Sequence, residues 1–131
     1  MFAALLMLAP PAIDRADPAT WPPELDAVVA APDHHKVLLE NDEVRVLEVV
    51  LPPATTERVH AHRWPAVIQI QAGGDFIDRD HTGRILYDSR KTKNRPKLPL
   101  TLYAPPEPPH AVENLSRTET MRLLRVELKR R

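Results

Sequence analysis

Five proline pairs are spread along this chain, and they limit its secondary structure more than any other feature of the sequence. The chain has 131 residues and 15 prolines, and the pairs are Pro10-Pro11, Pro22-Pro23, Pro52-Pro53, Pro105-Pro106 and Pro108-Pro109. Proline has no backbone N–H and a fixed φ angle, so it interrupts helices and is common in turns and at the starts of strands. We therefore expect a protein with little helix.

Between the proline pairs, the apolar runs are short and rich in β-branched residues. The expected strands are Lys36–Glu40, Val44–Leu51, Val59–His62, Ala66–Ala72, Phe76–Arg79, Ile85–Asp88, Leu100–Tyr103, His110–Asn114 and Met121–Leu128. Asn41-Asp42 predicts a turn, and Asp80–Gly83 predicts a hairpin loop. One short helix is expected over Pro23–Ala30, with Trp21 packing its start against the body. This pattern predicts a single all-β domain, an antiparallel sandwich or barrel.

The charge balance narrows the classes of partner. Eighteen basic and eighteen acidic residues cancel, so no net field attracts nucleic acid or an anionic membrane. We therefore expect a small-molecule ligand, with no nucleic-acid or membrane partner. The absence of cysteine excludes disulfides, thiolate ligands and a cysteine nucleophile.

The amino terminus leaves the location of the protein open. Phe2–Ala9 is apolar but too short to span a membrane. It has the length of a signal-peptide core, yet no Lys or Arg precedes it and no small-x-small cleavage site follows. We expect a cytoplasmic protein, with an exported or periplasmic one as the alternative if residues 1–12 are part of a signal peptide.

The histidines are the candidates for chemistry. His60 and His62 are two residues apart on an expected strand, where alternating side chains place both on one face. His110, from a distant strand, supplies a third imidazole. Such a set suits iron, zinc, nickel or copper better than magnesium or calcium, which prefer oxygen ligands. His34, His35 and His81 are expected in solvated loops and not as ligands.

These residues resemble the two sequence motifs of the cupins. In the first motif His60, His62 and Gly73 match, Ala54 stands at the first glycine, and Ala66 stands where the motif has its glutamate ligand. In the second motif Pro105, His110 and Asn114 match, while Pro99 and Glu107 replace glycines. The resemblance implies a cupin jelly roll of about eight to ten antiparallel strands over residues 36–131, preceded by an N-terminal extension over 1–35. It also implies a metal ion held by His60, His62 and His110.

Ala66 in place of the glutamate changes the expected chemistry. Three neutral imidazoles leave the charge of a divalent ion uncompensated, which favours an anionic or chelating ligand. The other expected pocket residues are Trp64, Ala66, Ile68, Val112 and Asn114. Asn114 has two interpretations, since it either faces the pocket or makes a hydrogen bond at the strand end. No acid–base group is apparent beside the histidines, so redox chemistry is favoured over hydrolysis.

Two functional hypotheses follow. The first is a mononuclear metal-dependent enzyme, an oxygenase of the dioxygenase type or an isomerase, acting on a small polar or anionic molecule. The second is a cupin that binds a metal ion or a small molecule without turnover. In either case we expect a homodimer formed through the edge strands at Lys36–Leu51, which would cover an exposed sheet edge.

Overall fold

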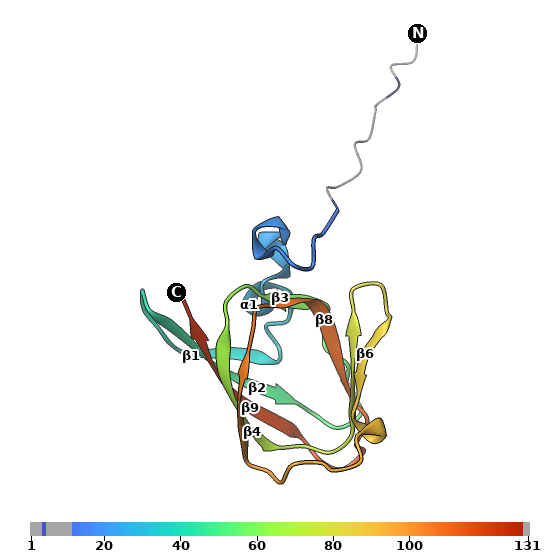
Figure 1. Cartoon of the computed structure of the whole chain (residues 1–131). Coiled ribbons are helices and arrows are strands. Elements are labelled where there is room, and N and C mark those ends of the chain that lie inside the picture. The colour runs from blue at the N-terminus through green and yellow to red at the C-terminus, as the bar shows by residue number, and fades with distance from the viewer. Residues whose placement is uncertain (1–3, 5–11, 130–131) are drawn as a thin grey trace.

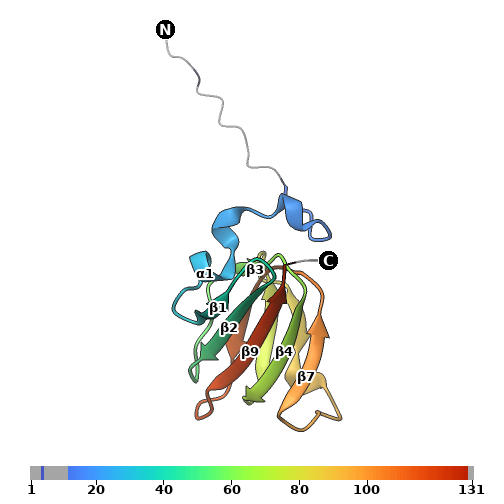
Figure 2. The ribbon, with the colours of Figure 1, turned by 90° about the vertical axis from the view of Figure 1, so that its left-hand side faces the viewer.

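The computed structural model describes residue 4 and residues 12–129, and its main body is two antiparallel sheets that face each other (Figures 1 and 2). The first sheet has five strands in the order β1-β2-β9-β4-β7, and the second has four in the order β3-β8-β5-β6. The strands are β1 (His35–Glu40), β2 (Val44–Leu51), β3 (His60–His62), β4 (Ala66–Ala72), β5 (Phe76–Asp80), β6 (Ile85–Asp88), β7 (Leu100–Ala104), β8 (Glu107–Asn114) and β9 (Met121–Leu128). The expected all-β fold is confirmed.

Eight of the nine expected strands agree with the observed bounds to within one residue, and β8 is the exception. The strand β8 begins at Glu107, three residues before the expected start, and therefore contains the pair Pro108-Pro109. The ladder between β3 and β8 is irregular there, because His60 lies opposite His110 whereas His62 lies opposite Glu107. A bulge of this kind accommodates residues that cannot donate to the ladder. The expectation that the prolines precede this strand was therefore wrong.

The segment before β1 lies over one end of the two sheets, next to β3 (Figure 1). The expected helix over Pro23–Ala30 is divided into a 3-10 turn η2 (Pro23–Leu25) and a single α turn α1 (Ala27–Ala30). Asp26 separates them, since its ψ angle is 136° and its side chain accepts a hydrogen bond from the Val28 N–H at 3.1 Å. Trp21 is buried and its Nε1 donates to the Asp14 carbonyl at 2.8 Å, so the expected packing of Trp21 is confirmed.

The extreme amino terminus lies outside the described residues, and with it most of the apolar segment considered as a signal-peptide core. In the part of the chain that the structure covers, no helix is both long and apolar enough to cross a membrane.

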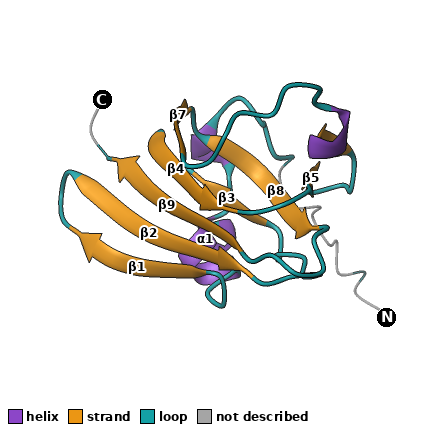
Figure 3. Ribbon diagram, turned by 90° about the horizontal axis from the view of Figure 1, so that it is seen from below, coloured by secondary structure: helices purple, strands orange, loops and turns teal. Residues whose placement is uncertain are grey.

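The core lies between the two sheets, which Figure 3 shows from below. Alternate residues of β2 point inward, and Leu47, Val49 and Leu51 are buried. Ala66 and Ile68 of β4 are buried in the same way. Ala54, at the motif's first glycine position, has a φ of 53°, the left-handed conformation that glycine adopts at no steric cost. This local geometry explains why the cupin motif has glycine there.

Candidate metal centre

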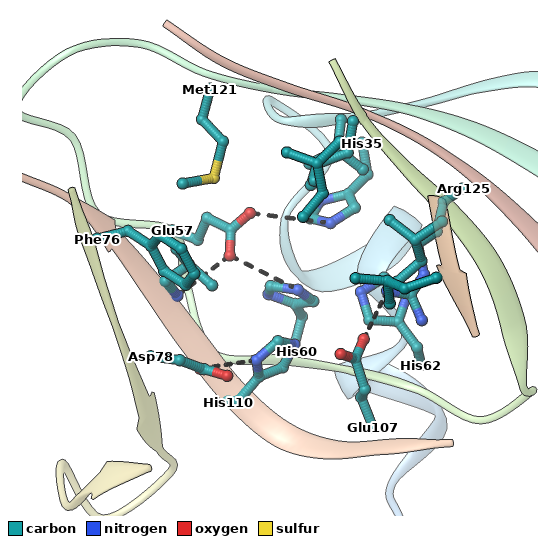
Figure 4. Close-up of a pocket in the computed structure, with 16 residues that line it drawn as sticks. His35, Glu57, His60, His62, Phe76, Asp78, Glu107, His110, Met121 and Arg125 are labelled. Carbon is teal, nitrogen blue, oxygen red and sulfur yellow. Dashed lines mark hydrogen bonds and ion pairs between the residues drawn. The ribbon is translucent and has the colours of Figure 1, made fainter. Parts of the chain in front are cut away.

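Four histidines meet in a cavity of about 190 Å³ between the sheets (Figure 4). The three expected ligands lie together, with ring centroids 5.0 Å apart for His60 and His62, 4.7 Å for His60 and His110, and 5.9 Å for His62 and His110. The cavity is lined by His35, Val49, Glu57, His60, His62, Ile68, Ile70, Phe76, Asp78, Leu102, Glu107, His110, Val112, Met121, Leu123 and Arg125.

His35 is the fourth histidine, and its expected place in a solvated loop was wrong. It is the first residue of β1, and it is buried with its ring centroid 4.5 Å from His60 and 5.4 Å from His62. The strand begins one residue earlier than expected, and this places the side chain inside. His34, by contrast, is half-buried in the preceding turn, and His81 is exposed in the loop after β5.

All four rings are held in the same way, because each makes a hydrogen bond through Nδ1. Nδ1 of His35 donates to the Ala31 carbonyl at 3.0 Å, and Nδ1 of His60 donates to the Arg58 carbonyl at 2.8 Å. Nδ1 of His62 and His110 lie 2.8 Å from the carboxylates of Glu127 and Asp78. The Nε2 atoms are therefore left for the cavity, and that of His110 is buried without a hydrogen-bond partner among the described residues.

Candidate ligand atoms form two overlapping triads. The atoms of His35, His60 and His62 lie within 4.8 Å of one another, and so do those of His62, Glu107 and His110. His62 belongs to both triads, whereas His60 belongs to the first and His110 to the second, so the three expected ligands are divided between the triads. Sets of nitrogen ligands with one carboxylate are typical of sites for transition metals.

Burial keeps three of the four imidazoles neutral. It lowers the pKa of His35 to about 4, and it lowers the pKa of His60 and His62 well below the usual range. Burial acts in the same direction on His110, but the hydrogen bond to Asp78 and its negative charge outweigh it and raise the pKa of His110. Neutral imidazole is the form that binds a metal ion, and an ion at His110 would displace a proton.

Carboxylates surround the histidines, so the expectation that no acid–base group lies near them was wrong. Glu57, Asp78 and Glu107 all line the cavity. Burial raises the pKa of Glu57 to about 7, while its Oε2 accepts a hydrogen bond from the Val112 N–H at 3.2 Å. Glu57 lies in the segment before β3, where strand alternation gives no guide to side-chain direction, so the sequence does not predict its place in the cavity.

Ala66 is buried on β4, opposite Glu127 of β9 in the ladder. Glu127 is fully buried, and it binds His62 through Oε1 and the Nε of Arg45 through Oε2 at 2.7 Å. The other nitrogens of Arg45 donate to Asp26 at 2.9 and 3.1 Å. A chain of polar contacts thus joins His62 to the segment before β1. Strand alternation from Met121 places Arg125 and Glu127 inward, so the sequence does carry a signal for these two residues.

The other expected pocket residues divide into two groups. Ile68 and Val112 line the cavity, whereas Trp64, Ala66 and Asn114 lie outside its lining. Trp64 packs against the guanidinium of Arg45, 4.9 Å from the ring centroid. Asn114 is buried and donates through Nδ2 to the carbonyls of Leu51, Pro52 and Glu119. Of the two interpretations of Asn114, the structure supports the hydrogen bond at the strand end.

Two facing antiparallel sheets with a histidine cluster between them define the class of the fold, a double-stranded β-helix. Solved cupin structures resemble it. A cupin domain protein from Bordetella pertussis matches with a TM-score of 0.58 and 21% identity, over 73% of this chain and 92% of that one. An RmlC-like cupin from Methanocaldococcus jannaschii matches with a TM-score of 0.51 and 14% identity, over 72% and 77%. The chain therefore has the cupin fold, as its motifs indicate. No protein-family model and no curated protein sequence matches the chain.

Proposed function

We propose that this protein binds one divalent transition-metal ion through His60, His62 and His110, and that it is a metal-dependent enzyme acting on a small polar or anionic molecule. The observation that carries the proposal is the hydrogen bond that each of the three buried rings makes through Nδ1 to a carbonyl or carboxylate oxygen. Metal-binding histidines in proteins are held in this way, because the second ring nitrogen fixes the tautomer and the direction of the ligand atom.

The donor set fits such an ion. The Nε2 of His110 is buried and lacks a hydrogen-bond partner in the described part of the chain, and a metal ion would satisfy it. Imidazole nitrogens favour iron, zinc, nickel or copper, whereas magnesium and calcium prefer sites made only of oxygen.

The residues of the cavity supply the conditions for catalysis. A bound ion supplies Lewis-acid chemistry or, if it is iron, oxygen chemistry. Ile68, Leu102 and Val112 line the cavity with apolar surface and limit the water beside the reacting groups. Asp78 and Glu107 also line the cavity, and a carboxylate within hydrogen-bond reach of a bound molecule can accept a proton from it. An oxygenase or an isomerase both fit this description, and the metal decides between them.

Oxygen uptake tests the enzyme hypothesis. Protein loaded with Fe²⁺ is assayed with small bidentate anions, 2-oxo acids and catecholates, beside metal-free protein, zinc-loaded protein and the His110→Ala variant. We expect uptake with at least one class of compound from the iron-loaded protein alone. If no compound is turned over by the iron-loaded protein and none is isomerised by the zinc-loaded protein, the enzyme hypothesis fails and a binding role without turnover is favoured.

A further inference from the structure

Glu57 and His35 lie at the centre of the cavity, although neither belongs to the two histidine motifs. The Oε1 of Glu57 is 4.0 Å from the Nε2 of His35, and its Oε2 is 3.8 Å from the Nε2 of His60 (Figure 4). The side chains of Glu57 and of both histidines are at most 4% exposed. A carboxylate and two imidazoles from two segments, the start of β1 and the chain that enters β3, therefore meet in a buried space.

Hydrogen bonds between Glu57 and the two imidazoles do not explain why these groups lie together. Nδ1 of each ring carries the proton of a neutral imidazole, because its partner is a main-chain carbonyl that only accepts. The two Nε2 atoms then present lone pairs to the carboxylate, at distances too long for a hydrogen bond. Within residues 12–129, no Lys or Arg pairs with Glu57. An ionised carboxylate buried without a cation is costly, so Glu57 either holds a proton, as in the metal-free protein, or pairs with a positive ion between these groups.

The distances between the carboxylate oxygens of Glu57 and the two Nε2 atoms suit a single metal ion bound between them. Nitrogen and oxygen ligands lie about 2.0–2.2 Å from zinc, so two ligands of the same ion are at most about 4.3 Å apart. The separations of 4.0 Å from His35 to Oε1 and of 3.8 Å from His60 to Oε2 fall under this limit, so a carboxylate that uses both oxygens suits the ion. Glu107, the other carboxylate near the histidines, is already compensated, since its Oε2 accepts from the Nη1 of Arg125 at 2.5 Å and its side chain is 30% exposed. Glu57 is therefore the better candidate for a ligand.

We propose that Glu57 and His35 bind the metal ion together with the histidines of the motifs, and that Glu57 supplies the carboxylate that the cupin motif carries at the position of Ala66. This inference rests on the proposed metal binding and deepens it. A site with this donor set is one for a divalent ion that accepts both nitrogen and oxygen, such as Fe²⁺, Co²⁺, Ni²⁺ or Zn²⁺. The strand β1, outside both motifs, then becomes part of the metal site.

Metal affinity of matched variants tests the proposal. The wild-type chain, Glu57→Gln and His35→Gln are freed of metal, checked for folding by circular dichroism, and titrated with Zn²⁺ against a chelating dye. We expect each variant to bind Zn²⁺ at least about tenfold more weakly, the effect that loss of even an indirect contact has at metal sites. His34→Gln and Glu43→Gln are the controls, and we expect both to stay within about threefold of the wild type, because neither residue lines the cavity.

The visible spectrum of bound Co²⁺ gives a second readout that a merely structural role does not change. Loss of a carboxylate ligand in Glu57→Gln alters the d–d bands, whereas Glu43→Gln leaves them as in the wild type. Wild-type affinity and spectrum in both Glu57→Gln and His35→Gln would overturn this inference and leave the proposed metal binding intact. A wild-type chain that binds neither ion would overturn both.

Discussion

Glu57 is a buried carboxyl group, and its burial makes a prediction about pH. Burial raises its pKa from 4.5 to about 7 in the metal-free protein. The folded state therefore holds its proton more tightly than the unfolded state does. The stability that this proton contributes is present below pH 4.5 and is lost as the pH rises to about 7. At 1.36 kcal/mol for each pKa unit, the loss is about 3 kcal/mol.

Glutamine does not titrate, so Glu57→Gln removes the part of the pH dependence of stability that comes from Glu57. We predict that the free energy of unfolding of the variant, relative to wild type, rises by about 2–3 kcal/mol between pH 4.5 and 7.5 without metal. Urea denaturation at a series of pH values measures the difference. Glu43→Gln, at an exposed surface position, is the control and should follow the wild type throughout. A constant difference between Glu57→Gln and wild type over this range would show that Glu57 is not a buried, protonated group.

Asn114 makes a prediction about stability alone. Its Nδ2 donates to three main-chain carbonyls, and its Oδ1 accepts from the Ser116 N–H at 3.0 Å. Asn114→Ala leaves these buried groups unpaired, so we predict a loss of about 2–3 kcal/mol in the free energy of unfolding. Metal affinity should stay within about threefold, because Asn114 lies outside the cavity lining.

Urea denaturation and a Zn²⁺ titration measure the two quantities, with the exposed Asn94→Ala as the control. A strong loss of Zn²⁺ affinity without a loss of stability would restore the interpretation in which Asn114 faces the pocket.

At the scale of the elements, β1 is an edge strand with apolar side chains in contact with solvent. Val37, Leu38 and Leu39 are 40%, 48% and 51% exposed. Exposed apolar edges promote pairing with another chain, so we predict a homodimer formed through β1. The double variant Leu38→Lys/Leu39→Lys should then be monomeric in analytical ultracentrifugation at concentrations where the wild type is a dimer.

The opposite edge supplies a matched control for this dimer. In β6, Ile85 and Leu86 are 50% and 41% exposed, so Ile85→Lys/Leu86→Lys makes the same change of charge on the other sheet. This variant should remain dimeric. A monomeric wild type, or a dimer that only the β6 variant disrupts, would refute the assignment of the interface to β1.

The elements also show which rules for interpreting the sequence were sufficient. The bounds of β2, β4, β6 and β9 were predicted correctly, because turn residues or proline bound an apolar pattern at each end. The expected start of β8 at His110 was wrong, because a bulge accommodates the pair Pro108-Pro109 inside the strand. That error also hid Glu107, which comes to lie opposite His62.

For the whole molecule, the cupin fold and the meeting of His60, His62 and His110 were predictable from two motifs that lie far apart in the chain. The remaining groups of the cavity were not. His35 and Glu57 reach it because β1 starts inside the barrel and the segment before β3 runs along β8, where the Glu57 N–H donates to the Val112 carbonyl at 3.0 Å. Such contacts depend on how non-adjacent strands are placed, and neither local propensity nor spacing along one segment encodes this placement.

The most direct test of the account is the metal content of the protein purified without an affinity tag or chelator, measured by elemental analysis as ions per chain. We predict a nearly stoichiometric transition metal in the wild type and in the His34→Ala and His81→Ala variants, and little metal in His60→Ala, His62→Ala and His110→Ala. A wild type that holds no metal and retains none after reconstitution would contradict the account. Equal losses in the two groups of variants would contradict it as well.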